Sequence, residues 1–95
     1  MFVWEESKRG QVIKEHKVDF AKIGDIFDDP FAIYIEDYEH STEIETRFNI
    51  IAITAQYGLI FAVFIYEGES GIHFITARRA ENWMVKEYEE NRKRL

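Results

Sequence analysis

Arginine and histidine residues in and beside the strand-like segments of this chain are of the types best suited to chemistry on a phosphodiester. Arg47 and His73 lie within such segments, and Arg78 and Arg79 stand where the last one ends. Arginine binds phosphate through paired N–H donors and stabilises developing negative charge, and histidine transfers protons near neutral pH. In the alternative interpretation these residues have no chemical role: Arg47 forms an ion pair with a nearby glutamate, and Arg78 and Arg79 are solvated.

Lysines flank the first predicted helix and offer further positive charge. Lys8 lies early in that helix and Lys17 lies just beyond it, with acidic residues between the basic ones. The two lysines would extend a phosphate-binding surface, or they would belong to an ordinary exposed face.

Other chemistries find little support in the residues present. The three histidines, His16, His40 and His73, have no spacing typical of metal ligands, and the chain has no cysteine. Gly68 and Gly71 suit a hairpin turn better than a phosphate-binding loop. We therefore predict that the chain works without a metal ion or another cofactor.

The bulk composition predicts a single domain over residues 1–95, with 46% hydrophobic and 16% aromatic residues to build a core. The net charge is −6, which argues against general binding of nucleic acid. The charge is uneven, because residues 21–46 hold eight acids and one lysine, whereas residues 78–95 hold six bases and four acids. Acidic residues at the N-terminus and the absence of an apolar run of about 20 residues predict a cytoplasmic protein without a membrane segment.

The elements that must position these side chains follow from periodicity. Helices are predicted over residues 6–15 and 19–27 and from about residue 79, with strands over 31–36, 46–55, 59–67 and 71–77. The predicted fold class is therefore α+β, with an N-terminal helical pair, a four-stranded antiparallel meander and a C-terminal helix. A short extra strand is predicted at residues 2–4. The predicted core residues are Phe20, Ile23, Phe27, Ile33, Ile50, Phe61, Val63, Phe74 and Trp83.

Strand alternation bears directly on His73. It places His73 on the same face as Ile75 and Ala77, so a buried structural histidine competes with a catalytic one. The segment from Leu59 to Tyr66 is apolar on both faces, which predicts a strand covered on both sides or completed by a partner.

Six short motifs stand in the order and at the spacing of one protein family. They are Trp4-Glu5 with Lys8, His16 and Val18-Asp19-Phe20; Phe27-Asp28-Asp29-Pro30; Asp37-Tyr38-Glu39-His40-Ser41; Glu45-Thr46-Arg47-Phe48; Ile75-Thr76-Ala77-Arg78-Arg79-Ala80; and Tyr88-Glu89. In these motifs the chain resembles the BrnT family, the toxins of the BrnT–BrnA type II toxin–antitoxin systems.

The resemblance implies a RelE-like fold and RNA cleavage that stops translation. It also implies a BrnA-like antitoxin, a ribbon-helix-helix protein through which alone the complex contacts DNA. Carried over to matching positions, Lys8, Arg47, Arg78 and Arg79 are the basic residues of the site.

Four positions depart from the family pattern. The family has Asn, Gly, Arg and Glu where this chain has Val12, Lys17, His73 and Met84. Two hypotheses therefore stand side by side. One is a metal-independent endoribonuclease, in which His73 takes over proton transfer. The other is a catalytically weak protein that binds a DNA-binding antitoxin and modulates repression of their operon.

Overall fold

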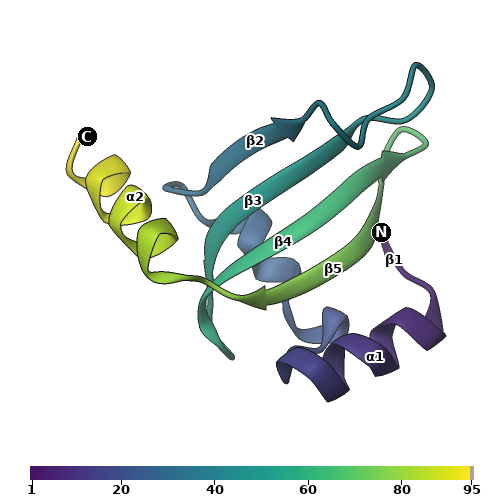
Figure 1. Cartoon of the computed structure of the whole chain (residues 1–95), viewed down its shortest axis with the longest axis horizontal. Coiled ribbons are helices and arrows are strands. Elements are labelled where there is room, and N and C mark those ends of the chain that lie inside the picture. Colours follow the sequence, from purple (N-terminus) through teal and green to yellow (C-terminus); the bar gives the residue numbers. More distant parts are fainter. Residues whose placement is uncertain (95) are drawn as a thin grey trace.

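A five-stranded sheet with helical segments on both of its faces forms the chain (Figure 1). The computed structural model describes residues 1–94. In chain order the elements are β1 (Phe2–Val3), α1 (Glu6–His16), the 3₁₀ helices η1 (Phe20–Lys22) and η2 (Gly24–Asp28), β2 (Ile33–Asp37), β3 (Arg47–Thr54), β4 (Gly58–Glu67), β5 (Gly71–Arg79) and α2 (Asn82–Lys93). Leu95, the last residue of the predicted domain, lies outside the described residues.

The strand order is β1-β5-β4-β3-β2. Strands β2 to β5 pair antiparallel with their neighbours in sequence, as predicted. The predicted four-stranded antiparallel fold is nevertheless wrong, because β1 adds a fifth strand that runs parallel to β5 and makes the sheet mixed. The Ile72 N–H donates to the Met1 carbonyl oxygen at 2.9 Å, which extends this pairing. A strand of two residues has no alternation from which its direction can be predicted.

The prediction of a second α-helix in the N-terminal pair is also wrong. In its place stand η1 and η2, and the three apolar residues Phe20, Ile23 and Ile26 are all buried. Their spacing of three matches the three residues per turn of a 3₁₀ helix, so this segment buries one face better when wound tightly. The predicted N-cap at Asp19 is confirmed, since its carboxylate accepts from the Ala21 N–H at 2.9 Å.

Each face of the sheet packs against different helices. The first face lies against α1, η1 and η2, where Phe20, Ile23, Ile50 and Phe74 are buried as predicted. The second face lies against α2 at one end only, where Met84 and Tyr88 meet Ile51. The remaining members of the first core are Val12, Val18, Ile26, Ala52, Ile60, Ala62, Phe64 and Ala77.

Some predicted core residues lie nearer the surface. Phe27, Ile33, Phe61 and Val63 are half-buried, and Trp83 is 53% exposed, so its prediction as a core residue is wrong. Helix α2 starts at Asn82 rather than near residue 79, because β5 continues to pair with β4 up to Arg79. The later start leaves Met84 and Tyr88 to make the contact with the sheet.

Helix α2 is tied to the loop before β2 by two hydrogen bonds. The Tyr88 hydroxyl donates to Asp29 Oδ2 at 2.8 Å, and the Asn91 side-chain amide donates to the Phe31 carbonyl at 2.9 Å. Burial, and then the bond to the Asp29 carboxylate, raise the pKa of Tyr88 to about 12. Among residues 1–94 no helix is long and apolar enough to cross a membrane.

A β-bulge in β5 changes which side chains share a face. Val63 pairs with Thr76 and Phe64 pairs with Phe74, so Ile75 is an extra residue on β5. Phe74 and Ala77 both lie in the core of the first face although they are three positions apart. His73 therefore faces the second side of the sheet. The prediction that His73 shares a face with Ala77 is wrong, because the bulge inverts the alternation.

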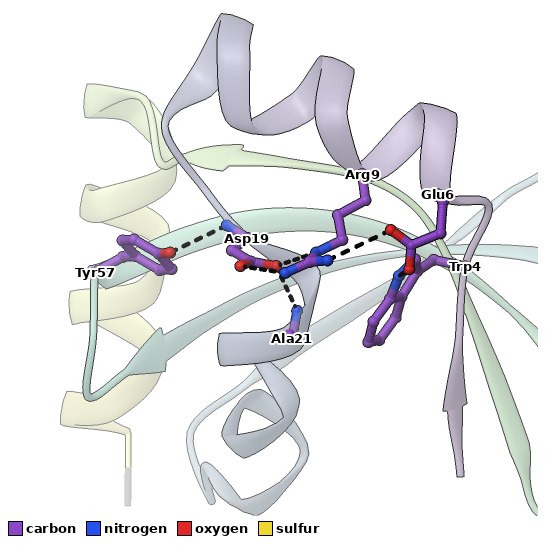
Figure 2. A network of polar contacts seen from close by, with 6 residues as sticks. All are labelled: Trp4, Glu6, Arg9, Asp19, Ala21 and Tyr57. Atoms are coloured by element: carbon purple, nitrogen blue, oxygen red, sulfur yellow. Dashed lines mark hydrogen bonds and ion pairs between the residues drawn. The ribbon is translucent and has the colours of Figure 1, made fainter.

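A polar network anchors α1 to the rest of the chain (Figure 2). Arg9 donates to both carboxylate oxygens of Asp19, at 2.8 and 3.0 Å, and the Asp19 N–H donates to the Tyr57 hydroxyl at 3.1 Å. Glu6 accepts from Arg9 and from the indole N–H of Trp4. This network fixes the start of the helix on which Lys8 lies.

The Arg9 guanidinium holds the pKa of the Asp19 carboxyl below its usual value. Ionised Asp19 therefore stabilises the fold above about pH 4, and this contribution is lost as the pH falls through the lowered folded-state pKa. We expect Asp19→Ala to cost about 1 kcal/mol or more at pH 7, since it also removes a cap. Urea unfolding from pH 7 to pH 2.5 should show the gap to wild type narrowing below pH 4. The exposed Asp28→Ala is the control, and a gap independent of pH would contradict the role of the ion pair.

Candidate functional site

A shallow hollow of about 200 Å³ is lined by residues of α1, β3 and β5, and we call it the cationic hollow. Three of the sequence-predicted site residues, Lys8, Arg47 and His73, line it together. The other lining residues are Glu5, Phe74 and Ile75. The structure thus brings two cations and one histidine to one place, with Glu5 as a single acid at its edge.

The sheet register explains why Arg47 and His73 meet. Both are paired with Ile65, so Arg47, Ile65 and His73 form one row across β3, β4 and β5. Neighbouring strands lie about 4.8 Å apart, which puts the Cα atoms of Arg47 and His73 about 10 Å apart. This row lies on the second face, beyond the part that packs against α2.

Helix α1 contributes Lys8 from beside the edge of the sheet. Strand β1 ends where Val3 pairs with His73, and the chain then turns into α1, so Glu5 and Lys8 come next to β5. The adjacent Arg9 is fixed by Asp19 (Figure 2). Lys8 is therefore carried on a helix whose position is set by a two-bond ion pair.

Two polar atoms on β3 are buried without a hydrogen-bond partner among the described residues. They are Arg47 Nε and Asn49 Oδ1. Glu45 Oε1 lies 3.8 Å from Arg47 Nε, so the expected ion pair is present but too long for a hydrogen bond. Asn49 is not among the residues that the sequence predicts for the site, yet alternation places it on the same face as Arg47. Both atoms are buried, so a ligand in the hollow would meet Arg47 through the exposed part of its side chain rather than through Nε.

Glu67 is a second residue that the sequence prediction omits. Its Oε2 lies 3.3 Å from His73 Nδ1. The signal that identifies it is the hairpin, since residues 67 and 71 are paired on either side of the turn and His73 follows two residues later. A carboxylate is thus placed against one ring nitrogen of the histidine that lines the hollow.

Arg78 lies on the same face but outside the hollow. Its partner on β4 is Phe61, four residues from Ile65, which is about 13 Å along the strand. The Arg78 guanidinium lies 5.0 Å from the Phe61 ring centre and 2.9 Å from Glu81 Oε1. The hydrogen bond from Arg78 lowers the pKa of Glu81. These contacts satisfy Arg78 within the chain.

Arg79 and Lys17 also lie outside the hollow. Arg79 pairs with Ile60 of the first face, and its guanidinium lies 5.7 Å from the Tyr57 ring centre. Lys17 closes α1 with a left-handed backbone, φ 60°, and its ammonium donates to the Lys14 carbonyl. The family's glycine suits such a backbone without strain, which gives the departure at Lys17 a structural meaning.

The two apolar departures are core residues here. Val12 packs in the core of the first face, and Met84 packs against Ile51 and Tyr88 on the second. Helix α2 therefore supplies no carboxylate at the Met84 position. Within residues 1–94 no group of three His, Asp or Glu side chains is arranged to hold a metal ion.

Lysine, arginine and histidine line a hollow on the part of the sheet that α2 leaves uncovered. This arrangement places the chain in the class of small α+β proteins that are suited to an anionic ligand. Comparison with known proteins narrows this class. The family described as "Ribonuclease toxin, BrnT, of type II toxin-antitoxin system" matches residues 4–83. The chain therefore belongs to the BrnT family of type II ribonuclease toxins, as the sequence motifs indicated.

A structural relative agrees with this assignment. The crystal structure of the Brucella abortus ribonuclease toxin, BrnT, is 25% identical and superposes with a TM-score of 0.67, covering 86% of this chain and 99% of that one. No curated protein sequence matches the chain. Since a type II toxin is paired with an antitoxin, membership of the family implies an antitoxin partner.

Proposed function

We propose that residues 1–95 form a single toxin domain that cleaves RNA without a metal ion and thereby inhibits translation. The observation that supports this most strongly is the meeting of Lys8, Arg47 and His73 in one hollow. Positive charge of this density suits a phosphodiester, and the family to which the chain belongs consists of ribonuclease toxins.

The reaction would use the RNA's own 2′-hydroxyl as nucleophile. His73 takes the proton of that hydroxyl, the bond from O2′ to phosphorus forms, and the bond from phosphorus to O5′ breaks. The departing 5′-oxygen takes a proton from the Lys8 ammonium or from water. Arg47 and Lys8, which line the hollow, stabilise the negative oxygens of the pentacovalent phosphorus.

The remaining predicted residues would act at a distance from the bond that breaks. Arg78 is on the same face, about 13 Å along the sheet, where a longer RNA chain would pass. Arg79 and Lys17 lie outside the hollow and would at most attract RNA through long-range charge.

We further propose that the antitoxin is a BrnA-like ribbon-helix-helix protein and that the complex works in the cytoplasm. DNA would be contacted only through that antitoxin. The net charge of −6 suits a basic partner better than direct DNA binding. The alternative function, an inactive protein that only binds its antitoxin, is favoured by the loss of the glutamate at Met84, which is a core residue here.

The test is cleavage of a defined RNA by the purified chain with EDTA present. We expect cleavage, products ending in a 2′,3′-cyclic phosphate and a 5′-hydroxyl, and inhibition when the antitoxin is added. An RNA in which the 2′-hydroxyl at the cleaved position is replaced by hydrogen should resist. Intact RNA after incubation with a chain that still binds its antitoxin would establish the alternative function instead.

A further inference from the structure

We infer that Glu67 is a positioning residue, which holds His73 by Nδ1 so that Nε2 faces the cationic hollow. This inference deepens the proposed function and rests on it. His73 departs from the family pattern, because the family has arginine at this position. The argument therefore uses the contacts of this chain alone.

The two side chains lie at ion-pair distance, close enough for a small rotation of either one to align a hydrogen bond between them. Glu67 Oε2 lies 3.3 Å from His73 Nδ1, and His73 is the residue that lines the hollow. An imidazole whose Nδ1–H donates to a carboxylate carries its free lone pair on Nε2, the nitrogen at the far side of the ring. That lone pair is the one able to accept a proton from a nucleophile, as in other pairs of histidine and carboxylate.

The hairpin keeps Glu67 and His73 on neighbouring strands, as diagonal neighbours two residues out of register. Glu67 pairs with Gly71, and a Cβ atom at Gly71 would collide with the carbonyl oxygen of Glu67. Only glycine therefore permits this close approach. On its other side β5 is held by β1, because Val3 pairs with His73 and the Ile72 N–H bonds to Met1. His73 is thus fixed from both neighbouring strands.

The charged groups around His73 give Glu67 a specific role. Glu5, which precedes α1, Lys8 of α1 and Arg47 of β3 line the hollow with His73. Among residues 1–94, Glu67 is the one carboxylate within ion-pair distance of the ring. The His73 side chain is 22% exposed and that of Glu67 is 58% exposed, so water weakens the contact. We therefore expect a smaller effect than a buried carboxylate would have.

The experiment compares Glu67→Ala, Glu67→Gln and the matched control Glu69→Ala, which removes an equal charge from the exposed turn two residues away. Glu67→Ala should lower kcat for RNA cleavage about 10–100-fold with little change in KM. Glu67→Gln, which retains an accepting oxygen, should lie between, and Glu69→Ala should match wild type. In ¹⁵N NMR spectra the neutral His73 ring should carry its proton on Nδ1 in wild type and shift towards Nε2 in Glu67→Ala.

Each outcome has a definite meaning. If wild type cleaves RNA and Glu67→Ala equals Glu69→Ala in kcat, the positioning role is overturned while the nuclease function stands. An unchanged His73 tautomer in Glu67→Ala overturns it as well. If wild type does not cleave, the proposed function and this inference both fall.

Discussion

Replacing Arg47 by alanine is expected to reduce kcat/KM for RNA cleavage about 10²–10³-fold, which is the usual loss when a well-placed charge stabiliser is removed. Arg47 lines the cationic hollow, and its Nε–H is buried without a hydrogen-bond partner in the described chain. The cleavage rate of a defined RNA under single-turnover conditions measures the effect. Arg92→Ala, which removes an exposed arginine of α2, is the matched control and should cleave like wild type.

The position of Arg78 makes this prediction selective. Arg78 is paired with Glu81 and packs on Phe61, about 13 Å along the sheet from the row that contains Arg47. Arg78→Ala should therefore weaken cleavage much less than Arg47→Ala does. If Arg78→Ala abolished cleavage and Arg47→Ala did not, the chemistry would lie at the α2 end of the sheet rather than in the hollow.

A second large effect is expected in the core of the first face. Phe74→Ala should lower the free energy of unfolding by about 3–5 kcal/mol. Phe74 is fully buried, so its truncation removes buried apolar surface and leaves a cavity. Its ring stacks with those of Phe2 and Phe20, at centroid distances of 5.4 and 5.6 Å. Urea unfolding followed by tryptophan fluorescence measures the loss.

Phe61→Ala is the natural comparison, since Phe61 is a phenylalanine on the neighbouring strand that is only half-buried. Its loss should be clearly smaller, although it also removes the contact with the Arg78 guanidinium. Equal losses at the two positions would mean that the second face is packed as tightly as the first, contrary to the exposure of its residues.

The sequence predicts those elements whose signals are local. Helix α1 was predicted to within a residue, and Asp19 was identified as a cap because its side chain needs only the N–H two residues away. The winding of residues 20–28 was not predicted, since Phe20, Ile23 and Phe27 also suit an α-helix. Which of the two patterns prevails depends on the sheet against which the segment packs.

The site was predicted in part for a similar reason. The chemistry of the side chains predicts Lys8, Arg47 and His73, and the family resemblance supports the first two, while their meeting depends on long-range register. The sequence predicts Trp83 in the core on the assumption of a helix from about residue 79. The helix starts at Asn82 instead, and only its packing on the sheet decides which side chains it buries. Glu67 and Asn49 have ordinary local sequence contexts, so only the folded sheet reveals that they lie beside the predicted residues.

The bulge at Ile75 decides which side chains of β5 point to the first face of the sheet and which point to the second. Between Ala77 and the turn, this one extra residue decides whether the odd-numbered or the even-numbered positions face the core of the first face. Straightening the bulge with Ile75 retained would leave Lys8, Arg47 and His73 chemically unchanged, yet it would turn the imidazole towards the hydrophobic interior and a phenylalanine ring outwards. Alignments of relatives across this hairpin must therefore place their gaps with care, because an ungapped alignment to a relative without the bulge would match the His73 position to a core position.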